Sequence, residues 1–262
     1  MHEIADIACN FTSDRFDNDL DEVINQAIVN NITKFGLICS RLSDIDKLLE
    51  IYNRYSKDMF FTIGVHPHHA NEINEEYLKK LKEVINNNNP HAIGETGLDF
   101  FRNLSTYEEQ IFAFEEQIKI AIDTNKPLFL HQRDSHDDFI KILRKYSSDI
   151  NKSVVHCFTG TKEQLNDYLE LDCYIGVTGW ICDAKRNVEL RKTIKNIPLE
   201  RLMIETDCPY LIPKNLEEKP KNNRNEPTYL NHIANEVATL MKKDINDIRE
   251  KTYKTSLSFF QK

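Results

Sequence analysis

Short apolar runs recur along the chain, and several of them end at a residue with an ionisable side chain. The runs at 92–94, 127–130, 153–155 and 202–206 lead into Glu95, His131, His156 and Asp207 respectively. Short apolar or β-branched runs bounded by turn residues are typical of buried strands. The helical-looking stretches that follow them favour parallel strands, which are buried on both faces.

The same pattern predicts eight strands in all. The clearest intervening helix is predicted over 106–125, because Thr106 and Glu109 form a capping-box pattern ahead of apolar residues at helical spacing. Eight strands alternating with helices favour a (β/α)8 TIM-type barrel, in which the carboxyl ends of the strands meet on one face. The predicted strands are 4–10, 33–39, 59–66, 91–97, 127–132, 153–158, 172–178 and 201–207.

The length agrees with this fold, since such a barrel needs about 250 residues and the chain has 262. We therefore expect one domain over residues 1–262 and a monomer. No apolar stretch approaches the roughly 18 residues of a membrane span, and the first residues lack the basic and apolar regions of an export signal. We expect a cytoplasmic protein without membrane association. Its six cysteines, with no Cys-x-x-Cys spacing, are predicted to be reduced thiols.

The polar residues at the strand ends predict a metal site. A single histidine in such a place is more often a hydrogen-bonding residue than a ligand. Convergence of Glu95, His131, His156 and Asp207 from different strands favours ligation instead, and mixed histidine and carboxylate ligands suit Mg²⁺, Mn²⁺ or Zn²⁺. Such a centre with open positions would acidify a bound water and hold an oxyanion.

Five blocks of sequence stand out between the first predicted strand and the last helix. They are Gly64-Val65-His66-Pro67-His68, Ala92-Ile93-Gly94-Glu95-Thr96-Gly97-Leu98-Asp99, His156-Cys157-Phe158-Thr159-Gly160, Glu205-Thr206-Asp207-Cys208-Pro209-Tyr210-Leu211 and Arg224-Asn225-Glu226-Pro227. Together they resemble the TatD-type metal-dependent deoxyribonucleases, a branch of the amidohydrolase superfamily. The resemblance implies that Glu95, His131, His156 and Asp207 are metal-site residues and that His66 and His68 lie beside the substrate phosphate.

The first strand departs from the family pattern. Many members begin with Asp-x-His-x-His, whose histidines bind a second metal, whereas this chain has Ala8 and Asn10 at those positions after Asp6. Alanine cannot ligate, and an amide oxygen suits Mg²⁺ better than Zn²⁺. This variant resembles the namesake subgroup of the family. That resemblance implies a Mg²⁺-dependent 3′–5′ exonuclease, with one or two ions, that acts on single-stranded DNA and RNA in DNA repair.

The roles of individual residues can be predicted only in part. Glu95 is predicted to be a catalytic metal ligand, bridging two ions when both are present. Asp207 is either a ligand of the weaker site or the base that takes a proton from the attacking water, and Glu205 is expected to be a buried acid at the strand end. The residues predicted to bind substrate are His66, His68, Arg102, Arg133 and Arg224.

The net charge of −8 excludes a broad basic surface, so a nucleic acid must be bound locally. Basic residues of the loop 208–227 could contact phosphates, or the loop could simply be solvated. Trp180 and Tyr210 could stack on unpaired bases or pack beneath loops. The basic residues of this loop are Lys214, Lys219, Lys221 and Arg224.

Two alternatives remain at this point. A barrel of the same superfamily could be an amidohydrolase that acts on a small molecule, but the chain lacks the His-x-His pair and the lysine of the usual dinuclear site. It could also be a catalytically silent barrel that binds a partner. Retention of the four predicted metal-site residues argues against such decay.

Overall fold

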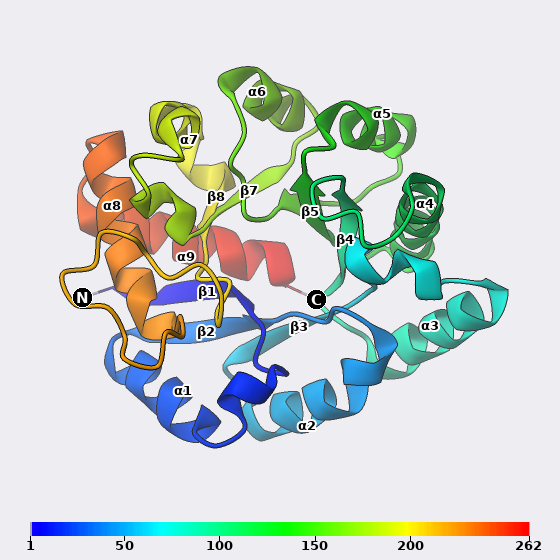
Figure 1. The fold of residues 1–262 in the computed structure, drawn as a ribbon, viewed down its shortest axis with the longest axis horizontal. Coiled ribbons are helices and arrows are strands. Elements are labelled where there is room, and N and C mark those ends of the chain that lie inside the picture. The colour runs from blue at the N-terminus through cyan, green and yellow to red at the C-terminus, as the bar shows by residue number, and fades with distance from the viewer. Residues whose placement is uncertain (1, 262) are drawn as a thin grey trace.

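The computed structural model of the protein describes residues 2–261, and it has eight parallel strands in one sheet with the order β1 to β8 (Figure 1). Helices surround the strands, so the predicted TIM-type barrel is confirmed. All eight predicted strands are present. They are β1 Ile4–Cys9, β2 Ile32–Leu37, β3 Met59–Ile63, β4 Ala92–Asp99, β5 Leu128–Arg133, β6 Ser153–Val155, β7 Tyr174–Val177 and β8 Leu202–Ile204.

The predicted helix over 106–125 is α4, and it begins at the expected capping box. The Thr106 side chain accepts a hydrogen bond from the Glu109 backbone, and the Glu109 side chain accepts one from the Thr106 backbone. Within residues 2–261 no helix has the length and apolar character needed to cross a membrane. The helices are α1 Leu20–Val29, α2 Ile45–Tyr55, α3 Glu75–Asn88, α4 Tyr107–Asp123, α5 His136–Tyr146, α6 Lys162–Glu170, α7 Val188–Thr193, α8 Leu230–Met241 and α9 Ile245–Phe260.

Several strands end earlier than predicted, and the difference matters most at β6 and β8, which precede two predicted metal-site residues. The prediction extended β6 to residue 158 and β8 to residue 207, but both strands stop after three residues. Cys157 and Asp207 have φ values of 50° and 56°, a left-handed conformation that no strand contains. His156 and Asp207 therefore lie on loops just beyond the strands.

The barrel closes through a short seam and not through a full ladder. Between β1 and β8, Cys9 and Cys208 form an isolated bridge. The Asp207 backbone donates to the Ala8 carbonyl at 3.0 Å, and the Asn10 backbone donates to the Cys208 carbonyl at 2.8 Å. The side chains at the closing seam therefore stand next to Asp207.

Aromatic side chains fill the barrel interior below the carboxyl ends of the strands. Phe60 and Phe129 contribute from the strands, and Phe260 at the end of α9 stacks on Phe60 with ring centroids 4.6 Å apart. Figure 1 shows that α9 ends near the centre of the barrel. The aromatic side chains around Phe260 fill this end of the barrel, and the polar strand-end residues gather at the opposite face.

Candidate metal centre

Glu95 lies at the centre of a cluster of histidines at the carboxyl ends of the strands. Its Oε1 atom is 2.7 Å from His156 Nε2, 2.8 Å from His131 Nδ1 and 3.4 Å from His66 Nε2. We call these four residues the His–Glu cluster. His66 follows β3 and His156 follows β6, whereas Glu95 and His131 lie within β4 and β5. The structure thus brings together residues that are separated by up to 90 positions in the sequence.

Glycines let the strands approach closely just before this cluster. A Cβ on Gly64 would lie 2.6 Å from the Gly94 backbone, and one on Gly94 would lie 2.3 Å from the Phe129 carbonyl oxygen. Gly94 also has a φ of 150°, which side-chain-bearing residues rarely adopt. Only glycine therefore fits at these two positions, and the close contact of β3, β4 and β5 brings His66, Glu95 and His131 within reach of one another.

Asp99 supports the cluster from the end of β4. Its Oδ2 atom is 2.7 Å from His68 Nε2 and 3.3 Å from His131 Nε2. Its Oδ1 atom accepts hydrogen bonds from the backbone of Phe101 and Arg102. Asp99 thus fixes the outer side of His131 while the inner nitrogen faces Glu95, an arrangement that orients metal-binding histidines in other proteins.

Glu205 supports His156 in the same way. Its side chain is fully buried, as predicted for this acid, and its Oε1 atom accepts a hydrogen bond from the Cys157 backbone at 2.5 Å. Its Oε2 atom lies 3.5 Å from His156 Nδ1, and neither atom has another hydrogen-bond partner. His156 therefore has one nitrogen facing Glu205 and the other facing Glu95.

The sequence predictions did not include these supporting roles. The available signal was the spacing: Asp99 stands four residues after Glu95 on the same face of β4, and Glu205 stands two residues before Asp207.

Electrostatics in the cluster favour a cation. Burial would raise the pKa of Glu95, but the charges of His156 and His66 together with hydrogen bonds from His131 and His156 hold it well below its usual range. Burial lowers the pKa of His66 to about 4. The pKa of His156 is raised well above its ordinary value against the effect of burial, by the charges of Glu95 and Glu205. The cluster therefore stabilises positive charge between buried carboxylates.

Asp207 lines the same cavity. Its Oδ1 atom accepts a hydrogen bond from Asn10 Nδ2 at 2.9 Å. Burial raises its pKa to about 7, and the nearby charge of Glu95 acts in the same direction. The cavity has a volume of about 400 Å³ and is lined by Asn10, Ser40, His66, His68, His69, Glu95, Arg102, His131, His156, Cys157, Asp207 and Tyr210.

The donor atoms of the cluster fit a divalent metal ion. Single ligand atoms of His66, Glu95 and His131 all lie within 4.8 Å of one another, and His156 Nε2 approaches the same Glu95 oxygen. Three imidazole nitrogens and a carboxylate oxygen form a donor set that suits Zn²⁺ or Mn²⁺, and adjacent carboxylates such as Asp207 extend it towards Mg²⁺.

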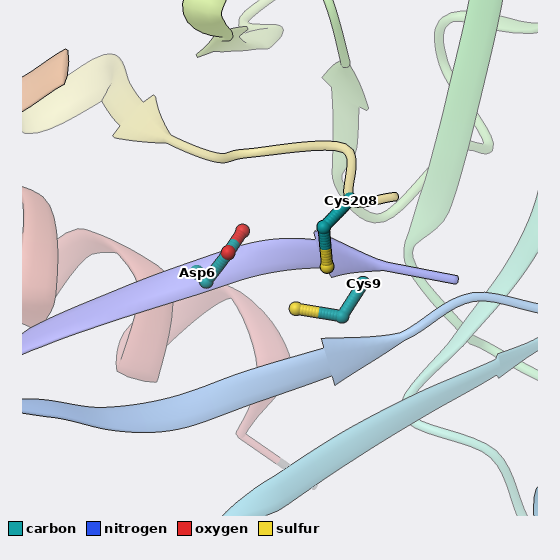
Figure 2. Close-up of side chains that lie close together, drawn as sticks. All are labelled: Asp6, Cys9 and Cys208. Atoms are coloured by element: carbon teal, nitrogen blue, oxygen red, sulfur yellow. The ribbon is translucent and has the colours of Figure 1, made fainter. Parts of the chain in front are cut away.

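A second group of potential ligands lies at the seam, where Asp6, Cys9 and Cys208 also have ligand atoms within 4.8 Å of one another (Figure 2). We call this group the seam cluster. Asp6 already accepts hydrogen bonds from the Thr206 backbone at 2.8 Å and from Thr206 Oγ1 at 2.5 Å. Burial raises the pKa of both thiols, so they stay protonated, whereas metals bind thiolates. The seam cluster is a packed structural group. All six cysteines are free, and only Cys157 is not fully buried.

The arginines predicted to bind substrate lie in three different places. Arg102 lines the cavity of the His–Glu cluster. Arg133 lines a neighbouring cavity instead and stacks on the Phe101 ring, with its Cζ atom 4.6 Å from the ring centroid.

The placement of Arg224 differs most from the prediction, because it is only 6% exposed. Its guanidinium contacts both carboxylate oxygens of Asp19, at 2.8 and 2.7 Å, and pairs with Glu226 at 2.8 Å. Two carboxylates neutralise its charge, so it anchors the loop 208–227 to the start of α1 and is not available to a phosphate. Sequence could not reveal this pairing, because Asp19 lies 205 residues away.

Comparison with known proteins agrees with this site. Residues 5–261 match the family of TatD related DNases. The "3'-5' ssDNA/RNA exonuclease TatD" of Edwardsiella piscicida is 39% identical over 258 residues, which cover 98% of this chain and 99% of that protein. The protein of the same name from Erwinia billingiae is 41% identical over 235 residues, 90% of each chain.

Solved structures agree as well. A hydrolase TatD family protein from Entamoeba histolytica superimposes with a TM-score of 0.89 at 31% identity, covering 99% of this chain and 98% of that one. The family match over residues 5–261 includes the first and last strands and every residue of the His–Glu cluster. The chain belongs to the TatD related DNase family.

Proposed function

We propose that this protein is a 3′–5′ exonuclease that hydrolyses phosphodiester bonds of single-stranded DNA and RNA with a divalent metal ion, Mg²⁺ in the cell, and that it acts in DNA repair. The observation that carries the proposal is the convergence of three histidines on Glu95 Oε1 at the open end of the barrel. Relatives that are about 40% identical over nearly the whole chain have the name of this activity. The catalytic unit is proposed to span residues 1–262 and to act as a monomer.

Glu95, His131 and His156 are proposed to hold the ion, with Asp207 as a further ligand or as the base. When bound, the ion would lower the pKa of a water molecule and neutralise charge on the phosphate. Asp99 and Glu205 keep the two histidine rings oriented through their outer nitrogens.

Asp207 is proposed to take the proton from the attacking water. A general base works best when its pKa is near the working pH, and burial raises the pKa of Asp207 to about 7. Asn10 donates to one of its oxygens at 2.9 Å and so fixes the direction of the carboxylate. The other oxygen is left to face the cavity.

His66, His68 and Arg102 are proposed to bind the phosphate, because all three line the cavity. Arg102 carries a permanent charge. His66 has a pKa of about 4 and is neutral at neutral pH, so it contributes a hydrogen bond and not a charge. Arg133, in the adjacent cavity, is proposed to contact the substrate farther from the reacting phosphate. Arg224 has no place in this proposal.

The test is release of mononucleotides from single-stranded DNA and RNA that carry a label at the 3′ end. We expect release with Mg²⁺, none with a chelator, and little release from a 5′ label at early times. The same assay separates the alternatives. An amidohydrolase would release no nucleotide at all, and a silent barrel would bind the strand without cleaving it.

A further inference from the structure

A second cavity, of about 350 Å³, adjoins the proposed active site and shares Tyr210 with it. It lies between the short 3-10 helix Gly179–Cys182 that follows β7 and the loop that follows β8. A nucleic-acid strand that left the metal cavity past Tyr210 would enter this second cavity. Its principal lining side chains are Arg15, Trp180, Arg186, Tyr210 and Lys214.

The charge of this cavity is opposite to that of the protein as a whole. Three cationic side chains line it and no carboxylate does, although the chain has a net charge of −8. The cavity beside Arg133, of about 440 Å³, is instead lined by Asp134, Asp137 and Asp138. Of these two cavities, only the one that shares Tyr210 with the metal cavity offers a polyanion a favourable electrostatic environment.

The cations have different partners. Arg15 donates to the carbonyl oxygens of Pro209 at 3.2 Å and Asn223 at 2.7 Å, which are neutral acceptors, so its positive charge is not cancelled. Arg186 pairs with Asp183 at 2.6 Å. Lys214 is exposed at the edge of the cavity. Arg15 and Lys214 therefore supply most of the available charge.

Two aromatic rings complete the cavity. Tyr210 is 54% exposed, which is a large exposed area for an aromatic side chain beside an active site. Trp180 is half-buried, and Arg186 stacks on it with its Cζ atom 5.1 Å from the ring centroid. The Thr178 hydroxyl accepts a hydrogen bond from the Trp180 backbone, which fixes the turn that carries the ring. Aromatic rings in a cationic groove are typical of sites that bind single-stranded nucleic acid without sequence preference.

We infer that this cavity binds the nucleotides that lie 5′ of the scissile phosphate, with their bases against Tyr210 and Trp180 and their phosphates near Lys214 and Arg15. The inference rests on the exonuclease function proposed above. A 3′–5′ exonuclease releases the last nucleotide from the metal cavity, whereas the retained strand must continue out to the surface. The second cavity offers that path, because Tyr210 lines both cavities.

Trp180 gives a direct test, because it is the single tryptophan of the chain. We would titrate the full-length protein with hexathymidylate in the presence of a chelator, so that no cleavage occurs, and follow tryptophan emission. Quenching is expected, with a midpoint that increases about tenfold in Tyr210→Ala, since a stacked base contributes this much or more to affinity. In Lys214→Gln the slope of log affinity against log salt should fall by about 0.7.

The matched control is Lys195→Gln, which removes the same charge. Lys195 is exposed and precedes β8, so it lies at the face of the barrel opposite the metal cavity. This variant should have the midpoint and the salt slope of the parent protein. Circular dichroism of each variant checks that the fold is retained.

Activity measurements with Mg²⁺ separate this inference from the proposed function. We expect Tyr210→Ala to raise KM for a hexanucleotide about tenfold more than KM for a dinucleotide. Equal effects on both substrates would overturn the assignment to the 5′ side. Hydrolysis without any quenching would overturn the subsite alone, whereas quenching without hydrolysis would support the subsite and refute the proposed function. If neither is seen, both proposals are wrong.

Discussion

The His–Glu cluster and the seam cluster lie at the same end of the barrel, and both contain potential metal ligands within 4.8 Å of one another. They differ in where their polar atoms point. The nitrogens of three histidines face one oxygen of Glu95. In the seam cluster the Asp6 carboxylate accepts hydrogen bonds from Thr206 and Ala8. Proximity of metal-binding residue types therefore does not by itself make a metal site, because a ligand atom must also be deprotonated and free of other partners.

The seam cluster has a structural task that explains its hydrogen bonds. β1 and β8 are joined by a single bridge and not by a ladder, and Asp6 adds side-chain contacts from β1 to Thr206 beyond the end of β8. Asn10 continues this line by donating to Asp207 at 2.9 Å. Asn10 therefore orients Asp207 from the first strand's end of the seam.

The largest effect should follow from loss of the His–Glu cluster. His156→Ala or Glu95→Ala removes a donor that is proposed to hold the metal, so nuclease activity should fall by at least about 10⁴-fold while the fold is retained. Cys208→Ala is the matched control from the seam cluster and should retain activity within about threefold. A well-folded Glu95→Ala protein with normal turnover would refute the proposed metal site.

The next effect concerns Asp207, which lines the cavity of the His–Glu cluster. Asp207→Asn keeps an oxygen ligand but removes the base, so kcat should fall by about 10²–10⁴-fold at saturating Mg²⁺. The Mg²⁺ concentration for half-maximal activity should change little. Recovery of the variant's rate in excess Mg²⁺ would identify Asp207 as a ligand instead.

A smaller effect is expected from Glu205, which contacts the metal-site histidine and not the proposed ion. Glu205→Gln weakens the interaction with His156 Nδ1, so affinity for Mn²⁺ should fall by about 10–100-fold, as is usual for residues that orient a ligand. Calorimetric titration with Mn²⁺ measures this. Unchanged Mn²⁺ affinity would mean that Glu205 only holds the Cys157 backbone.

Asp6 should have the smallest effect on activity, and its prediction concerns stability instead. Burial raises the pKa of Asp6 from 3.8 to about 7, so in this range the folded state keeps a proton that the unfolded state releases. The free energy of unfolding should therefore fall as the pH rises from about 4 to about 7, by at most about 4 kcal/mol for this group.

Asp6→Asn removes the titrating carboxyl and keeps an oxygen that can accept from Thr206. Its free energy of unfolding in chelator should fall less between pH 4 and pH 7 than that of the parent protein. Denaturant titrations at several pH values compare the two proteins. Parallel pH profiles would contradict the raised pKa of Asp6.

The sequence predicted the framework of the site better than its hydrogen bonds. Short apolar runs predicted all eight strands, four of them with an ionisable residue at the end, and parallel strands bring their carboxyl ends together whatever their separation in sequence. The supporting contacts of Glu205 and the pairing of Arg224 with Asp19 depend on the conformation of individual loops. At Cys157 and Asp207 the backbone leaves the strand with positive φ, which alternation along a strand cannot predict.

The central claim is that the His–Glu cluster, and not the seam cluster, holds the metal. The most direct measurement is anomalous diffraction from crystals soaked in Mn²⁺, a metal that Mg²⁺ sites accept. We predict a strong peak within about 2.5 Å of Glu95, His131 and His156 and none beside Cys9 and Cys208. A peak at the seam cluster, or none near Glu95, would contradict the claim.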